Sequence, residues 1–339
     1  MATLKGLKDL ALCAAQNKAP SDAPAEFQNA SDVNATLRDE LNVLASDFNS
    51  YRRNKYDIFE IIQTVADEIV PNKVIAIMGQ FAEVKQVGHG VRVSFTQKVG
   101  KQRAKQFLTR VGVSGVYETF RLDTKTFDIY PKAIGGAAYI DFERFLCGDE
   151  NIADYMDIIV EGLTDKVFEE VQAALQASVS ATRPANTVYS NTYNANELFK
   201  LCNVARAYGT GAVIFASPEF VASMGADAVT VGSTNWAHAA DLDSIHETGY
   251  VTIFRGTPIV RLPQSFTDVD NATKVVDPRY AYIFPTGGEK VVKVVMEGDT
   301  VVKEFENRDN SMEIQAYKKF GVGITTYHNW TAYYNSSLT

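Results

Sequence analysis

The chain is poor in cysteine and has no long apolar run. Its three cysteines, Cys13, Cys147 and Cys202, have no short paired spacing, which excludes a disulfide framework and a zinc ribbon. Charged residues such as Lys5 and Lys8 interrupt the apolar start, so a signal peptide is not expected, and no segment approaches a membrane span. We therefore expect a protein made in a reducing cytoplasm that has no contact with a membrane.

Residue patterns typical of enzymes are scarce as well. The glycines at 209 and 211 precede a predicted strand, whereas a dinucleotide-binding loop follows one. Residues 286–290 contain paired glycines and a lysine without the spacing of a P-loop, which favours a plain β-turn. Four side chains that can ligate metals match no established spacing and are interpreted as part of a polar loop: His238, Asp241, Asp243 and His246. We expect no enzymatic activity, no cofactor and no bound metal.

Size and composition are those of an ordinary globular protein. The chain has 339 residues, of which 46% are apolar and 22% charged, enough for a real core in two subdomains or one elaborated domain. The net charge is −8, but it is unevenly distributed. Residues 84–117 contain no acidic residue and these basic ones: Lys85, Arg92, Lys98, Lys101, Arg103, Lys105 and Arg110. Such asymmetry indicates an interaction arm.

The N-terminal third combines an arm with helical segments. Residues 1–33 are rich in Ala, Asn, Asp and Pro, with a short amphipathic piece near Leu7 and Ala11, and we expect them to order only against a partner. Helical spacing begins at residue 34 or 36 and is expected to end at Pro71.

A long basic hairpin is predicted next. Apolar and polar residues alternate over 91–99, a turn is expected at 100–103, and residues 107–113 would form the returning strand. A ribbon this poor in apolar residues cannot fold over a core of its own, so we expect it to lie on another surface. Its basic side chains suit either nucleic-acid phosphates, with Phe95 and Phe107 stacking on bases, or a protein interface.

A helix from about residue 151 to 178 is predicted to be the longest element. Its apolar stripe opposes a face that carries Asp154, Asp157, Glu161, Asp165, Glu169 and Glu170. A basic arm of one copy thus has a complementary surface on the next copy.

The remaining chain is predicted as α/β and then β. A helix over 195–207, a strand over 212–216 and a helix opened by Ser217 and Pro218 come first. Strands are expected at 250–254, 257–262, 280–284, 290–296, 301–306 and 312–327, with a turn at 297–299.

This order of elements resembles the major capsid proteins of tailed bacteriophages over nearly the full chain. The most specific stretches are 306–313 (ENRDNSME), 317–322 (YKKFGV) and 256–263 (GTPIVRLP). The resemblance implies an α+β capsid fold with an N-terminal arm and helix (1–77) and an extended β-hairpin loop (78–132). It also implies a peripheral domain on the long helix (133–190 and 296–339) and an α/β axial domain (191–295).

The implied function is that of a virion shell subunit that assembles in the host bacterial cytoplasm. It would form pentamers and hexamers around double-stranded DNA, without sequence-specific binding, and could meet scaffolding, portal and decoration proteins. Because only about eighty residues precede the loop, scaffolding would come from a separate protein, if from any. An encapsulin-like compartment shell is the alternative, and a metal-binding enzyme ranks third.

The candidate contact residues between subunits are Lys98, Lys101, Arg103 and Lys105 on the loop and Asp154, Asp157, Glu161 and Asp165 on the long helix. A covalent bond between Lys101 and Asn310 is the less favoured idea, because that chemistry needs a buried carboxylate as base.

Overall fold

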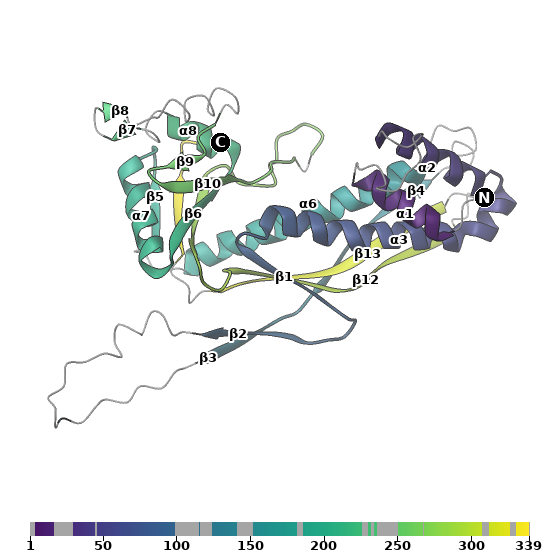
Figure 1. The fold of residues 1–339 in the computed structure, drawn as a ribbon, viewed down its shortest axis with the longest axis horizontal. Helices are drawn as coiled ribbons and strands as arrows, with labels where there is room; N and C mark the ends of the chain where they lie inside the picture. The colour runs from purple at the N-terminus through teal and green to yellow at the C-terminus, as the bar shows by residue number, and fades with distance from the viewer. Residues whose placement is uncertain are drawn as a thin grey trace.

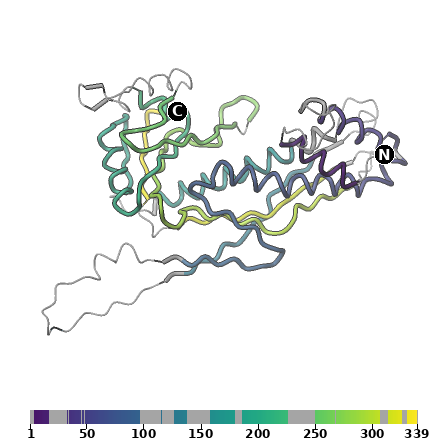
Figure 2. Tube along the Cα trace, viewed as in Figure 1, coloured from purple at the N-terminus to yellow at the C-terminus, as the bar shows by residue number. Residues whose placement is uncertain are grey.

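The computed structural model describes residues 4–16, 30–44, 46–98, 115, 124–140, 152–181, 186–225, 230–231, 234–235, 250–266, 268–306, 312–325 and 330–338. They form an elongated unit of long helices and strands, and a smaller unit at one end that carries the C-terminus (Figures 1 and 2). The expected mixture of helices and sheets is confirmed.

The elongated unit is built on a four-stranded sheet in the order β1-β12-β13-β4. Its strands are β1 (Ala82–Val87), β12 (Val292–Glu306), β13 (Met312–Ile324) and β4 (Lys132–Ile140); β1 is parallel to β12, and the other pairs are antiparallel. Two long helices, α3 (Phe48–Met78) and α6 (Ile152–Ala181), lie against this sheet (Figure 1). Alternation along β12 turns Val294 into the helix-covered core and Val295 to the other face.

Helix α6 confirms the predicted long helix, but α3 continues through Pro71 and is one residue longer than α6. An interior proline costs about 3 kcal/mol. Val74 and Met78, beyond the proline, are fully buried, and burying such side chains contributes about 1.5–3 kcal/mol each. The free energy gained by burying these side chains therefore exceeds the cost of the interior proline, and the predicted end of the helix at residue 71 is wrong.

The start of the chain folds against its own core. Helix α1 (Leu4–Ala15) packs on α2 (Ala30–Leu44) and α3, with Leu7, Ala11 and Ala14 buried. Lys8 also pairs with Glu60 of α3 at 2.6 Å. The expectation that the start orders only against a partner is thus wrong for residues 4–15, because its apolar stripe finds a surface within the chain.

Strand β12 passes through the segment predicted as a turn. Instead of reversing at 297–299, the strand shifts its register with β13 between Glu297 and Val301, which is a β-bulge, and Gly298 has a φ of 69°. A glycine and two acidic residues mark either a turn or a bulge, and the sequence pattern does not distinguish them.

The predicted hairpin has a different partner strand. Strand β2 (Val93–Lys98) pairs antiparallel with β3 (Thr124–Ile129), so that Lys98 faces Thr124. A hairpin closed at 100–103 would put residue 98 opposite a residue near 105, which this register excludes. The proposed return strand at 107–113 lies outside the described residues.

The smaller unit is a six-stranded sheet in the order β5-β14-β11-β6-β10-β9. Helices α7 (Ala195–Tyr208) and α8 (Pro218–Met224) confirm the prediction, and the Ser217 hydroxyl caps α8 by accepting the N–H of Phe220. Its strands are β5 (Thr187–Ser190), β6 (Gly211–Ala216), β9 (Ile253–Phe254), β10 (Thr257–Arg261), β11 (Tyr280–Thr286) and β14 (Thr331–Asn335), and a separate pair is β7 (Thr230–Val231) with β8 (Thr234–Asn235). Strand β14 was not predicted.

Adjacent glycines in β4 give a matched test of the packing. A Cβ added at Gly135 would lie 2.4 Å from both the Ala316 carbonyl oxygen and the Tyr317 Cβ, whereas one at Gly136 would meet nothing within 4 Å. We expect Gly135→Ala to lower the free energy of unfolding by about 1–3 kcal/mol and Gly136→Ala to change it by less than about 0.5 kcal/mol. Urea unfolding of the two variants measures both values, and equal losses would contradict the close approach of β4 to β13.

Candidate assembly surface

The base of the β2–β3 ribbon packs on the face of the sheet opposite the long helices. Val93, Phe95 and Ile129 are buried together with Val295, and the Phe95 ring stacks on Phe127 with centroids 5.8 Å apart. The ribbon thus lies on another surface, as expected, but for its base that surface is the sheet of its own subunit. The sheet therefore fixes the position of β2 and β3.

Two glycines of β13 let the ribbon come this close. A Cβ at Gly321 would lie 2.5 Å from a methyl group of Ile129, and one at Gly323 would lie 2.7 Å from another. The Lys85 ammonium lies 4.3 Å from the centre of the Phe95 ring, and the Lys293 ammonium lies 5.5 Å from it. Two cations therefore lie over this ring.

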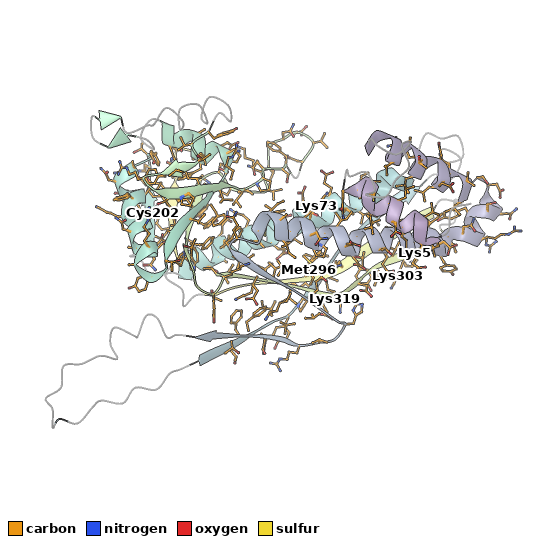
Figure 3. The ribbon with its side chains drawn as sticks, in the orientation of Figure 1. Lys5, Lys73, Cys202, Met296, Lys303 and Lys319 are labelled. Carbon is orange, nitrogen blue, oxygen red and sulfur yellow. The ribbon has the colours of Figure 1, made fainter. Side chains whose placement is uncertain are left out.

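The bulge in β12 clamps the loop that leads into the ribbon. The Glu297 carboxylate accepts the Gly90 N–H at 2.9 Å and the Lys319 ammonium at 3.2 Å (Lys319 is labelled in Figure 3). These hydrogen bonds lower the pKa of Glu297 from its ordinary value. At Gly298, a Cβ would lie 2.1 Å from the His89 ring, so only glycine lets His89 lie across the bulge.

Of the basic residues proposed for contacts, Lys98 is the one that the described part of the chain includes. Lys98 ends β2, whereas Lys101, Arg103 and Lys105 lie outside the described residues, as do Asn310 and the cluster from His238 to His246. At the base itself, Arg92 forms an ion pair with Asp128 of β3.

The acidic row on α6 is less uniform than its sequence indicates. Asp154 and Asp157 belong to the first turns of the helix, and Glu161 is exposed. Asp165 is half-buried, and burial raises its pKa against the opposing effects of Ser265 and Lys73. Glu169 pairs with Lys166 in the same helix. Of the described side chains of the row, Glu161 and Glu170 are the exposed carboxylates.

A second acidic surface on α3 was missed by sequence reasoning. A cavity of about 730 Å³ is lined by Glu60, Gln63, Thr64, Asp67, Glu68, Asn72 and Gln86. Asp67 is already engaged by the nearly buried Lys318 and by the Thr300 hydroxyl. The spacing of Glu60, Thr64, Asp67 and Glu68 along one helix face was the available signal.

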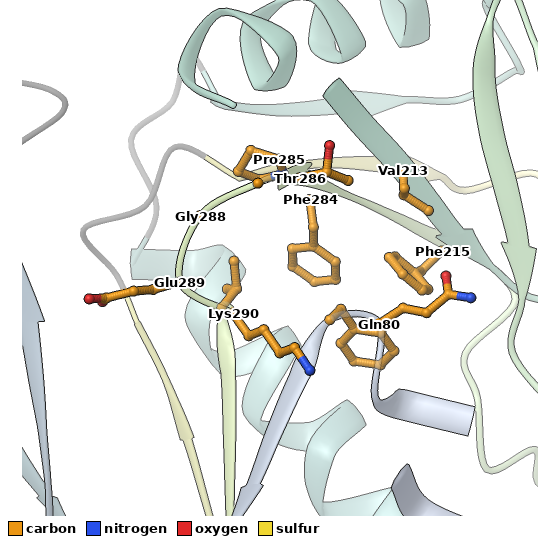
Figure 4. A pocket seen from close by; sticks show the side chains of 12 residues that line it. Gln80, Val213, Phe215, Phe284, Pro285, Thr286, Gly288, Glu289 and Lys290 are labelled. Atoms are coloured by element: carbon orange, nitrogen blue, oxygen red, sulfur yellow. The ribbon is translucent and has the colours of Figure 1, made fainter. Parts of the chain in front are cut away.

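An apolar cavity of about 380 Å³ lies where the two units meet. Phe81, Phe215 and Phe284 line it together with the segment from Pro285 to Val291 (Figure 4). Within that segment, Gly287 has a φ of 79°, in keeping with the predicted turn, and its neighbour Gly288 has open space around it.

Neither a metal-binding cluster nor a membrane-spanning helix is found in the described part of the chain. Within it, no group of three or more His, Cys, Asp or Glu side chains is placed to hold a metal ion. The helices in that same part include none with the length and apolar character required to cross a bilayer.

A long helix along a sheet, an anchored ribbon and an α/β unit at one end are features that the resemblance to the capsid proteins of tailed phages implies. The chain belongs to the family described as "SPbeta prophage-derived putative capsid protein YonB", whose model matches residues 7–331. The resemblance to phage capsid proteins drawn from the sequence is thereby confirmed. No curated protein sequence matches this chain.

Two solved phage structures share the fold. The capsid of cyanophage P-SCSP1u aligns with a TM-score of 0.51 at 11% identity, covering 76% of this chain and 88% of that one. Microbacterium phage Oxtober96 gives a TM-score of 0.51 at 11% identity, with 77% and 90% covered. The holo-SrpI encapsulin complex from Synechococcus elongatus PCC 7942 gives 0.49 at 11% identity, with 79% and 88% covered.

The clamp at Glu297 is open to a direct test. Glu297→Gln keeps an oxygen that can accept the Gly90 N–H but loses the charge that attracts Lys319. We expect faster backbone hydrogen exchange over residues 88–98 at neutral pH, measured by mass spectrometry. The matched change Glu170→Gln, at an exposed position of α6, should have no effect.

The sign of the pH dependence follows from the lowered pKa. The protection from hydrogen exchange that Glu297 supplies is complete at pH values above the ordinary carboxyl pKa of 4.5. It is lost as the pH falls through the lower pKa that Glu297 has in the folded protein. Identical exchange in the wild-type protein and Glu297→Gln across this range would show that apolar contacts alone hold the ribbon.

Proposed function

We propose that the protein is the structural subunit of an icosahedral virion shell that assembles into pentamers and hexamers and encloses double-stranded DNA. The observation that carries the proposal is the ribbon, whose base is fixed by Phe95, Ile129 and Glu297 while the acid-free segment continues past Lys98. A fixed base directs the basic segment toward a neighbour with less loss of conformational freedom on contact.

The domain division proposed from the sequence is kept with one adjustment. We assign 1–77 to the N-terminal arm and helix, 78–132 to the extended loop, 133–190 with 296–339 to the peripheral domain and 191–295 to the axial domain. Strands β5 and β14 pair within the six-stranded sheet, which supports moving 187–190 and 331–335 to the axial domain.

Contacts between subunits would join the basic loop of one copy to the acidic row of α6 on the next. Exposed ion pairs contribute at most about 1 kcal/mol each, but a closed symmetric shell repeats each contact many times. Residues 84–117 carry a charge of +7, so the rest of the chain carries −15 to give the total of −8, which leaves little positive surface for the DNA. Scaffolding, portal and decoration proteins would be further partners, and assembly would take place in the host cytoplasm.

Electron microscopy of the purified protein tests the proposal. Closed particles with five- and six-fold clusters are expected, and particles from infected or induced cells should contain double-stranded DNA. A protein cargo in place of DNA would support an encapsulin-like compartment instead. A protein that stays monomeric under all assembly conditions would contradict the shell function.

Charge reversal tests the contact between loop and helix. Changing Asp157 and Glu161 to Lys should reduce particle yield at low salt, where charges are least screened, because like charges would meet across the interface. Adding Lys101→Glu and Arg103→Glu should restore the yield. Asp39→Lys, an exposed reversal on α2, is the control. Normal assembly of the first variant would show that the loop docks elsewhere.

A further inference from the structure

The loop between β10 and β11 is a braced projection. Gln264 donates to the Val276 carbonyl at 2.9 Å and accepts the Val276 N–H at 3.0 Å, and the Val275 N–H binds the Ser265 carbonyl at 2.9 Å. The Lys274 ammonium pairs with Glu219 of α8 at 2.9 Å. In Figure 1 this loop extends from the smaller unit over α6.

The tip of this loop presents one apolar side chain between two carboxylates. Asp268 accepts the N–H groups of Ala272 and Thr273 at 2.9 and 3.0 Å, which closes the tip and lowers the pKa of Asp268. Val269 is 98% exposed, the most exposed of the large apolar side chains among the described residues. Single exposed apolar residues are common, but this one is held at the end of an internally hydrogen-bonded loop.

The apolar cavity between the two units has the complementary properties. Phe81, Phe215 and Phe284 line it. The Lys290 side chain extends along its rim (Figure 4), and its ammonium donates to the Gly79 carbonyl. A volume of about 380 Å³ is ample for the side chain of a valine and part of its turn. Glu289, also on the rim, is directed away from the cavity in Figure 4.

We propose that the Val269 tip of one subunit inserts into the apolar cavity beside Phe284 of a second copy, with Asp270 near Lys290. The exposure of Val269 excludes insertion into its own cavity. The loop leaves one side of the smaller unit, whereas the turn from β11 to β12 lies on the other (Figure 1). A contact between two different surfaces of identical subunits is heterologous and closes into a ring when the rotation permits. This inference rests on the proposed shell function and adds the surface that forms its rings.

Disulfide trapping tests the contact. Val269→Cys combined with Gly288→Cys places thiols on the tip and at the cavity rim, and the open space at Gly288 accommodates the new side chain. After oxidation of assembled particles, a non-reducing gel should show a ladder of linked subunits up to pentamers and hexamers. Val269→Cys combined with Asn72→Cys, on the polar face of α3 that lines the acidic cavity, should stay monomeric, as should each single variant.

The outcomes separate this inference from the shell function. If the wild-type protein forms particles but the oxidised double variant gives no ladder, or dimers only, the ring contact is wrong and the shell function still stands. Absence of wild-type particles would instead remove the shell function. Val269→Asp should lower particle yield at least about tenfold, with an unchanged circular dichroism spectrum, because a carboxylate enters an apolar cavity. Normal yield in this variant would also overturn the contact.

Discussion

The burial of both faces of β12 is the constraint on which the subunit depends. One face supplies Val294 to the core beneath α3 and α6, and the other supplies Val295 to the base of the ribbon. Two charged side chains of the sheet are nearly buried as well. Those of Lys293 and Lys318 are only 6% and 3% exposed, and each has an acidic partner. Leaving a buried charge unpaired costs about 3–5 kcal/mol, so Glu83 and Asp67 fix how β1 and α3 sit on the sheet.

This arrangement links the assembly surface to the stability of the fold. The ribbon is held by the same strand that forms the core, through Val295 and through Glu297 in the bulge. Its position therefore does not depend on a partner. The acidic residues of α6 and α3 are likewise carried on helices whose opposite sides are packed, which keeps the charged faces in place without further support.

Sequence reasoning succeeded where a pattern was local. The sequence predicted the apolar stripe of α6, the cap at Ser217 and the order of elements that resembles phage capsids, because periodicity and capping depend on neighbouring residues. It failed where a distant contact decided the outcome. Burial of Met78 carries α3 through Pro71, and the pairing of Lys98 with Thr124 replaces a nearer turn. The apolar cavity draws on three separate segments, so spacing alone could not reveal it. For the acidic cavity on α3, helical spacing marked one polar face, but it gave no sign that Gln86 completes the lining.

The parallel pairing of β1 with β12 also sets the order of events during synthesis. Lys293 and its partner Glu83 are 210 residues apart, so the platform for the ribbon cannot form until β12 has left the ribosome. At about 5–20 residues per second, this delays its formation by roughly 10–40 s after β1 emerges. A nascent chain therefore lacks a positioned ribbon until nearly all of the polypeptide has been made.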